Sequence, residues 1–417
     1  MGERIRATYL LETGLDPDAV AGVMAGEQSS GTFVAVPGET PELRRRAGAV
    51  VERVERLDTV AEPSLPGAAR PPDGARYSRA RVEISWPLDN IGPSLPNLMA
   101  TVAGNLFELR EVSGLRLLDI ALPRAFAQAC PGPAFGVEGT RRLAGVEGRP
   151  LIGTIIKPSI GLGPAETAGL VDGLCAAGID FVKDDELQSD GAHCPFEARV
   201  KAVMEVVARH ADRTGRKPMV AFNLTGEVDE MRRRHDVVAE HGGTCVMVSL
   251  NSVGLAGLMA LRRHCALPIH AHRNGWGYLS RHPMLGWSYR AWQTLWRLAG
   301  ADHMHVNGLD NKFCEANDSV VASARACLEP LFDDRPMTAM PVFSSGQSAR
   351  QAAATYEALG SVDLIYAAGG GIMAHPAGPA AGVASLREAW EAAVKGIPAE
   401  TYARSHEALR TALEAYR

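Results

Sequence analysis

The sequence lacks the features that mark membrane, secreted and zinc-dependent proteins. It contains no run of about 18 apolar residues, so we expect no membrane-spanning helix. Its N-terminal residues show no basic segment followed by an apolar run, so no secretory signal is expected. The seven cysteines form no CxxC pair, which favours reduced thiols in the cytoplasm over a zinc site or a disulfide framework. A net charge of -5 gives no electrostatic case for binding nucleic acid or a membrane.

Lysine is also scarce, although basic residues as a class are not. The chain has 37 arginines but only six lysines, and its first 156 residues contain no lysine. A lysine can lose its proton when buried and act as a base, nucleophile or carbamate, which arginine cannot do. We expect Lys201, Lys217 and Lys395, in polar or helical surroundings, to be ordinary positions. The remaining lysines are Lys157, Lys183 and Lys312.

The composition is that of an ordinary globular protein, 46% hydrophobic and 22% charged, and 417 residues suffice for two or three domains. We expect residues 1–125 to form an N-terminal α+β domain of ferredoxin-like type. Alternating patterns, helical spacing and Pro/Gly content respectively predict strands at 5–12 and 75–88, helices at 16–27 and 42–60, and a loop at 62–78.

From residue 151 onward, short apolar runs alternate with longer amphipathic segments. This alternation predicts βαβ units and a parallel sheet. Eight even units over about 250 residues favour a closed (β/α)8 barrel over an open doubly wound sheet. We therefore expect residues 126–417 to form a TIM barrel with C-terminal helices. The predicted barrel strands are 151–157, 180–185, 218–224, 244–250, 268–273, 301–306, 338–344 and 362–368.

Polar residues collect where these strands end, which is where barrel enzymes carry their active sites. The first strand ends in Lys157, and the second ends in Lys183, Asp185 and Glu186. Carboxylates are ligands that Mg²⁺ prefers, and alternation along a strand points Lys183 and Asp185 to one face. An ammonium there would repel a metal, whereas a lysine carbamate would bind it. The residues alone leave two interpretations open, a metal site and an ion-paired barrel interior.

Glycine-rich loops follow the last two strands, at 344–348 and 367–378. Loops at these positions of a barrel commonly offer backbone N–H groups to phosphate, so we predict a phosphate cradle there. Four histidines alternate on the fifth and sixth strands, and one pair is expected to face the core. A histidine zinc site is the rival metal interpretation, but the sequence has no HExxH motif. These histidines are His270, His272, His303 and His305.

Several segments together resemble the large-subunit RuBisCO superfamily. GTIIKPSIGLGP at 153–164 is similar to the family segment that carries its first catalytic lysine, and GIDFVKDDE at 178–186 to the segment with the carbamylated lysine. HAHR, DHMH, the serine-glycine and the triple glycine then follow in the family order. In the N-terminal half, GEQSSGTF at 26–33 and AGNLF at 103–107 resemble its active-site loops.

The resemblance implies a role for each matching residue. Lys157 would abstract a proton, with His272 as a secondary acid–base group, and Mg²⁺ would be held by Asp185, Glu186 and Lys183 as its CO2-derived carbamate. One phosphate would contact Arg273 and His305, and the other would contact Gly346, Gly369, Gly370 and Lys312, with Ser344 lining the substrate. The family forms homodimers with shared active sites, so Glu27, Thr32 and Asn105 would complete the partner's barrel.

Some positions depart from authentic carboxylases and indicate a RuBisCO-like (form IV) protein. Ser159 stands where carboxylases have a second lysine, and the loop after strand six reads NGLDNKFCE where theirs is glycine-rich. Ile155, Phe33 and Trp276 replace a threonine, a tryptophan and a histidine. We therefore expect metal-assisted enediolate chemistry without CO2 fixation.

The expected reaction is decarboxylation or C–C cleavage of a phosphorylated keto sugar acid of the 3-oxo-isoapionate 4-phosphate type. Three alternatives remain. An enolase or isomerase of methionine salvage is disfavoured because that enolase takes its base from an N-domain lysine, which is absent here. A true ribulose-bisphosphate carboxylase is disfavoured by Ser159, and a non-catalytic binding relative by the nearly complete set of site residues.

Overall fold

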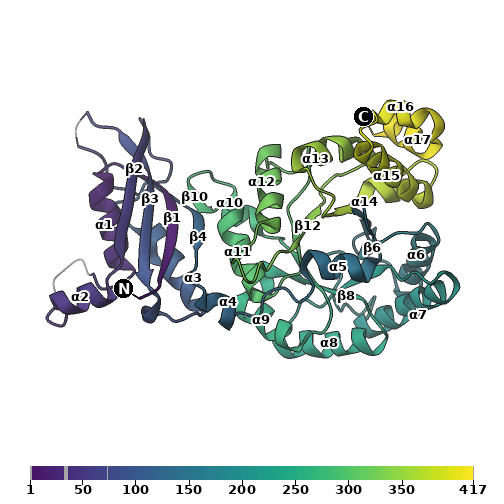
Figure 1. The fold of residues 1–417 in the computed structure, drawn as a ribbon, viewed down its shortest axis with the longest axis horizontal. Helices are drawn as coiled ribbons and strands as arrows, with labels where there is room; N and C mark the ends of the chain where they lie inside the picture. Colours follow the sequence, from purple (N-terminus) through teal and green to yellow (C-terminus); the bar gives the residue numbers. More distant parts are fainter. Residues whose placement is uncertain (1, 32–35, 73, 417) are drawn as a thin grey trace. The chain divides into compact units, whose positions relative to one another are not determined.

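The computed structural model describes residues 2–31, 36–72 and 74–416 of the chain. Packing divides the chain into two compact units (Figure 1). The first unit comprises residues 1–130 and 275–298, and the second comprises residues 131–274 and 299–417. Among the described residues, no helix combines the length and apolar character needed to cross a bilayer. None of the seven cysteines, all of which lie in the described part of the chain, forms a disulfide bond.

The first unit is a mixed α+β domain built on a five-stranded sheet of order β10-β4-β1-β3-β2. Helix α1 begins where Asp16 accepts a hydrogen bond from the Ala19 amide and Pro17 occupies the first turn. The strands are β1 (Arg4–Thr13), β2 (Val50–Val60), β3 (Tyr77–Pro87), β4 (Gly114–Ala121) and β10 (Leu285–Trp287). The helices are α1 (Pro17–Glu27), α2 (Pro41–Ala47), η1 (Leu88–Asn90), α3 (Leu95–Ala103), η2 (Asn105–Glu108), α4 (Ala125–Ala129), α10 (Trp276–Ser280) and α11 (Tyr289–Ala299).

The helix predicted at 42–60 is wrong over most of its length. Helix α2 ends at Ala47, the backbone becomes extended at Gly48, and residues 50–60 form strand β2 paired with β3. Over a short stretch, a valine-rich sequence is compatible with both the helical and the strand periodicity. Hydrogen-bonded pairing with β3 favours the strand. The sequence also gave no sign of β10, which adds a parallel edge to β4.

The second unit contains a closed barrel of eight parallel strands, as predicted from the alternation. Each predicted apolar run contains one observed strand, although the observed strands are shorter. The barrel strands are β5 (Leu151–Ile155), β6 (Phe181–Lys183), β7 (Met219–Asn223), β8 (Cys245–Ser249), β9 (Ile269–His272), β11 (His303–His305), β12 (Met340–Phe343) and β13 (Ile365–Ala367).

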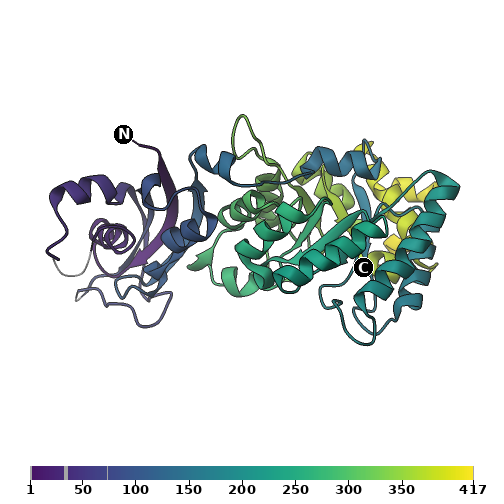
Figure 2. The same ribbon diagram turned by 90° about the horizontal axis from the view of Figure 1, so that it is seen from below.

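Helices surround the barrel, and helices α15 and α17 pack together near the C-terminus (Figures 1 and 2). The helices of this unit are α5 (Gly136–Ala144), α6 (Pro164–Ala176), α7 (Phe196–Thr214), α8 (Val228–Glu240), α9 (Leu250–His264), α12 (Asn317–Leu328), η3 (Ala349–Gln351), α13 (Ala352–Leu359), α14 (Gly369–Met373), α15 (Pro379–Val394), α16 (Ala399–Tyr402), η4 (Ala403–Ser405) and α17 (Glu407–Ala415).

The barrel interior is filled by alternate residues of the strands, including Leu151, Phe181, Met247, Val342 and Ile365. Helix α5 closes the amino-terminal end of the barrel, where its Val137 and Ala144 side chains pack against these residues. The residues predicted to carry the chemistry lie at the opposite, carboxyl-terminal end of the strands.

Candidate active site at the carboxyl ends of the barrel strands

Strands β5 and β6 bring a lysine and a carboxylate together. Lys157 follows β5, and its Nζ donates to Asp185 Oδ2 at 2.7 Å and to Ser159 Oγ at 2.7 Å. The Asp185 side chain is only 3% exposed, whereas that of Lys157 is 41% exposed. Two hydrogen bonds therefore fix the position of the Lys157 amine, and the side chain remains exposed enough for a substrate to reach it.

Lys183 lies deeper, at the end of β6, with its side chain 1% exposed. Its Nζ donates to the Asp184 carbonyl at 2.7 Å and lies 3.4 Å from Glu186 Oε2. Burial lowers the pKa of Lys183, against the opposing attraction of Glu186 and Asp185. A lowered pKa increases the share of unprotonated amine, which is the form that reacts with CO2 to give a carbamate.

Asp184, between these residues in sequence, has a structural role. Its Oδ2 accepts from Arg199 Nη2 at 3.1 Å and from the Asn223 amide at 3.0 Å. Residues 184–186 follow the last residue of β6, and their contacts show their directions: Asp184 turns toward Arg199, whereas Asp185 and Glu186 contact the lysines. The structure therefore brings together the four residues that the sequence singled out on the first two barrel strands.

His272 completes this group from β9. Its Nε2 lies 3.4 Å from Glu186 Oε2, and its Nδ1 accepts from the Asn274 amide at 3.2 Å. Burial and the nearby Lys183 lower the pKa of His272 to about 4. Burial opposes ionisation of Glu186, but His272 and Lys183 outweigh it and hold the pKa of that carboxyl at about 2. At neutral pH the pair is a neutral imidazole beside a carboxylate.

The donor set suits a hard divalent cation. Asp185 and Glu186 supply carboxylate oxygens, and amines of two lysines now lie against those oxygens at 2.7 and 3.4 Å. The two lysine amines thus balance the negative charge of these carboxylates, at the place where a metal cation would do so. Oxygen donors of this kind are those of Mg²⁺ sites.

The rival histidine site is not at these strand ends. Among the described residues, the group with metal-ligand spacing is His235, Asp236 and His264, on α8 and α9. The Ala266 amide donates to His235 Nε2 at 3.2 Å, so the proton of the neutral ring lies on Nδ1, which faces Asp236 at 2.9 Å. That tautomer opposes ligation through Nδ1.

The predicted phosphate cradle lies beside the lysines. A pocket of about 620 Å³ is lined by Gly346, Ser348, Arg350, Gly370, Gly371 and Tyr416, among others. A Cβ at Gly369 would meet Lys157 Cε at 3.9 Å, and one at Gly346 would meet the Lys312 amide nitrogen at 3.6 Å. Gly369 therefore lies near the Lys157 side chain and Gly346 near the Lys312 backbone, although the Lys312 ammonium lies over the Phe313 ring.

Backbone strain marks the same rim. Asn307 and Ser345 follow β11 and β12, and both have positive φ, 68° and 70°, which non-glycine residues rarely adopt. The Ser345 hydroxyl donates to Asn307 Oδ1 at 2.8 Å, and this hydrogen bond links the two residues of unusual backbone conformation.

Arg273 and His305 were expected to bind a phosphate, but both have protein partners. Arg273 Nη2 contacts Glu315 Oε2 at 2.5 Å, and Asn307 Nδ2 donates to the same oxygen at 2.8 Å. His305 is buried between His270, at 2.8 Å, and Ser344, at 3.1 Å. Glu315 was missed by the sequence analysis, because no spacing signal links this loop carboxylate to an arginine 42 residues away.

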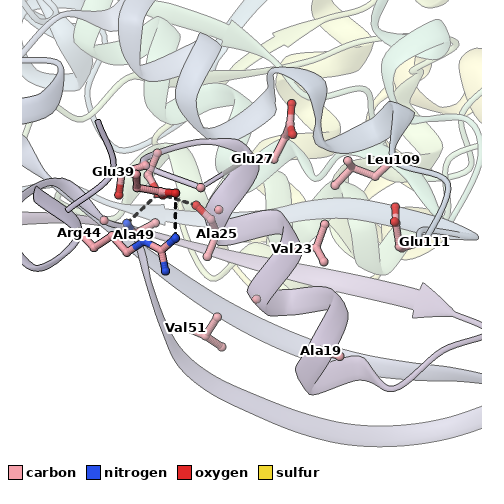
Figure 3. Close-up of a pocket in the computed structure, with 16 residues that line it drawn as sticks. Ala19, Val23, Ala25, Glu27, Glu39, Arg44, Ala49, Val51, Leu109 and Glu111 are labelled. Carbon is pink, nitrogen blue, oxygen red and sulfur yellow. Dashed lines mark hydrogen bonds and ion pairs between the residues drawn. The ribbon is translucent and has the colours of Figure 1, made fainter. Parts of the chain in front are cut away.

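The first unit brings together two of its three predicted site residues. Asn105 Nδ2 donates to Glu27 Oε1 at 3.1 Å, joining η2 to the end of α1. Thr32, like Phe33, lies outside the described residues. Glu27 lines a pocket of about 810 Å³ (Figure 3). Glu39 and Arg44 line the same pocket and form an ion pair of 2.8 Å, and Glu27 lies away from that pair. Participation of Glu27, Thr32 and Asn105 in a partner's barrel stays a prediction.

Known protein families account for both units. Residues 3–126 match the N-terminal domain of the ribulose bisphosphate carboxylase large chain, and residues 136–416 match its catalytic domain. The chain belongs to this family. The resemblance inferred from the motifs is confirmed, as are the mixed N-terminal domain and the barrel.

Individual relatives of this RuBisCO family member narrow the comparison. A 3-oxo-isoapionate-4-phosphate transcarboxylase/hydrolase of Xanthobacter autotrophicus is 64% identical over 417 residues, 100% of both chains. A 3-oxo-isoapionate-4-phosphate decarboxylase of Rhizobium etli is 46% identical over 98% of both chains. The crystal structure of a RuBisCO-like protein from Burkholderia fungorum matches with a TM-score of 0.93 and 49% identity, covering 99% of this chain and 100% of that one.

Proposed function

We propose that this RuBisCO-like enzyme acts on 3-oxo-isoapionate 4-phosphate or a closely similar keto sugar acid phosphate, cleaving a C–C bond without fixing CO2. The observation that carries the proposal is the convergence of Lys157, Lys183, Asp185 and Glu186 at one end of the barrel. The activities of the 64% and 46% identical relatives support the choice of substrate.

The residues present suit a bound Mg²⁺ held by Asp185, Glu186 and the carbamate of Lys183. Such an ion, when bound, stabilises the negative charge that develops on adjacent substrate oxygens. By setting the position of the ion, the two carboxylates and the carbamate would determine where those substrate oxygens lie. His272 would offer its Nε2–H beside Glu186.

Lys157 handles the proton in this proposal. Its side chain is partly exposed at the carboxyl end of the barrel, and hydrogen bonds to Asp185 and Ser159 fix the position of its Nζ. Loss of CO2 from a 3-oxo acid leaves an enolate, whose carbon must then receive a proton. Lys157 Nζ is the group that would deliver that proton or remove one in the reverse sense.

The phosphate would bind at Gly346, Gly369 and Gly370, near the Lys157 side chain. Glu315 occupies Arg273 at 2.5 Å, which disfavours a second phosphate at that position. A substrate with one phosphate is therefore favoured over a bisphosphate, which supports the proposal over a true carboxylase. Shared active sites in a homodimer and a cytoplasmic location are also proposed.

The reaction is tested by ¹³C and proton NMR in D2O with Mg²⁺ and bicarbonate, using 3-oxo-isoapionate 4-phosphate carrying a labelled carboxylate. A decarboxylase releases the label as CO2 and places deuterium in the product. A transcarboxylase/hydrolase keeps the label in an acid product. Retention of the intact carbon chain with exchange or isomerisation alone would overturn the proposal and favour the enolase or isomerase class.

A further inference from the structure

A line of buried polar side chains runs through the barrel from helix α5 to the active-site end. It consists of Thr140, His303, His270, His305 and Ser344, and we call it the histidine relay. At its start, Thr140 Oγ1 contacts the Gly136 carbonyl at 2.5 Å and His303 Nε2 at 2.9 Å. The Thr140 and His303 side chains are fully buried. On the neighbouring strands β12 and β8, the ladder partners of His303 and His270 are Met340 and Met247, which belong to the apolar interior.

The relay continues across neighbouring strands in register. His303 of β11 pairs with His270 of β9 in the ladder, and their Nδ1 atoms lie 3.4 Å apart. His270 Nε2 lies 2.8 Å from His305 Nε2, and His305 Nδ1 lies 3.1 Å from Ser344 Oγ. Every ring nitrogen of the three histidines therefore has a partner within the relay.

The direction of each hydrogen bond follows from the Gly136 carbonyl, which can only accept. Thr140 gives its one hydroxyl proton to that carbonyl, so it accepts from His303 Nε2–H. A neutral His303 then has a bare Nδ1, which accepts from His270 Nδ1–H. Burial lowers the pKa of His303 to about 3 and that of His270 well below its usual value, so both rings are neutral at pH 7.

The same logic fixes the active-site end. His270 has a bare Nε2 that accepts from His305 Nε2–H, and burial likewise lowers the pKa of His305. His305 Nδ1 is then bare and accepts the hydroxyl proton of Ser344. Ser345 gives its own proton to Asn307 Oδ1, so it does not donate to Ser344.

We propose that the histidine relay turns the Ser344 proton inward and makes the Ser344 oxygen an acceptor for a substrate hydroxyl. Thr140, at the far end of the barrel, is then a positioning residue that acts through three rings. The assignment of a substrate to Ser344 rests on the proposed function, but the tautomers of the rings do not.

The test is a two-bond ¹H–¹⁵N correlation spectrum of the full chain labelled with ¹⁵N-histidine, with His→Gln variants assigning the signals. We expect Nε2–H at His303 and His305 and Nδ1–H at His270. Thr140→Val removes the terminal acceptor and should redistribute the tautomers as far as His305, whereas Thr140→Ser should restore them. A wild-type His305 protonated at Nδ1, or tautomers unmoved by Thr140→Val, would overturn the relay.

Thr355→Val is the matched control. Thr355 is 1% exposed and donates to the Gln351 carbonyl four residues earlier at 2.7 Å, as Thr140 does to Gly136, but among the described residues it forms no hydrogen bond with a histidine of the relay. With 3-oxo-isoapionate 4-phosphate, we expect Thr140→Val to lower kcat/KM about tenfold, the value of one hydrogen bond, and Thr355→Val to leave it unchanged. Equal kinetics of the two variants would overturn the role of Ser344. A wild-type enzyme inactive on this substrate would instead overturn the proposed function, and the tautomers would then decide the relay alone.

Discussion

The two ends of the barrel both contain buried carboxylates, but they neutralise them differently. At the amino-terminal end, Asp302 accepts from Arg262 Nη1 at 2.9 Å and from three backbone amides, and Asp180 is paired with Arg149 at 2.5 Å. At the carboxyl-terminal end, Asp185 and Glu186 face lysines instead. Arginine keeps its charge and forms fixed multiple bonds, whereas lysine can lose its proton. One end is built for stability and the other for chemistry.

The largest effect expected is loss of activity in Lys183→Arg. Arginine preserves positive charge beside Glu186 but cannot form the carbamate that the proposed metal site needs. We expect kcat to fall about a thousandfold or more while thermal unfolding changes little. Steady-state kinetics and calorimetry on the same preparation measure both quantities. Activity within tenfold of wild type would remove Lys183 from the proposed chemistry.

The converse change at the amino-terminal end is Asp302→Asn. It leaves Arg262 buried without a carboxylate and sets an amide group against backbone donors. Such a loss costs about 3–5 kcal/mol of unfolding free energy. Urea unfolding measures it, and the kcat of the folded fraction should change far less than in Lys183→Arg. A larger effect on kcat than on stability would break the division between the two ends.

Acid should destabilise the barrel through its interior histidines. Burial lowers the pKa of His303 to about 3, so its ring stays neutral in the folded state while the unfolded chain takes up a proton near pH 6.5. The unfolded state then binds more protons, and stability falls as pH drops from about 6.5 toward 3, by about 1.4 kcal/mol per pH unit for this group. Urea unfolding at a series of pH values measures the slope. His303→Gln should lower the slope by about 1.4 kcal/mol per pH unit, and the part that remains would come from the other buried histidines, among them His270 and His305. An unchanged slope in His303→Gln would contradict this account.

Sequence reasoning found most of this architecture because the signals are local. The eight barrel strands follow from apolar runs, and the lysine and carboxylate positions follow from where those runs end. The error at 42–60 arose because Val50, Val51 and Val54 suit a helix or a strand, and only pairing with β3 decides. Glu315 and Thr140 were missed because their partners are set by the closed barrel, which brings Thr140 to His303 across 163 residues.

Glu315→Gln tests a smaller difference within the carboxyl-terminal end. Arg273 and Glu315 form the kind of arginine–carboxylate pair that is typical of the opposite end, with side chains 8% and 14% exposed. Removing the charge should let Arg273 attract an anion, so a sugar bisphosphate should inhibit about tenfold more tightly. Inhibition constants measure this, with the exposed Glu357→Gln as control. An unchanged constant would mean that Glu315 does not govern the number of phosphates accepted.

The smallest effect is expected where a lysine has no chemical task. Lys395 forms a 2.5 Å ion pair with Glu391 one helical turn away, and both side chains are 51% exposed. Exposed pairs of this kind contribute little to stability because water screens them, and arginine can form the same pair. Lys395→Arg should therefore leave both kcat/KM and the midpoint of urea unfolding unchanged. Since this substitution is chemically the same as Lys183→Arg, the contrast between the two isolates the environment of the lysine. A marked loss of activity in Lys395→Arg would mean that lysines outside the active site also have a role that arginine cannot fill.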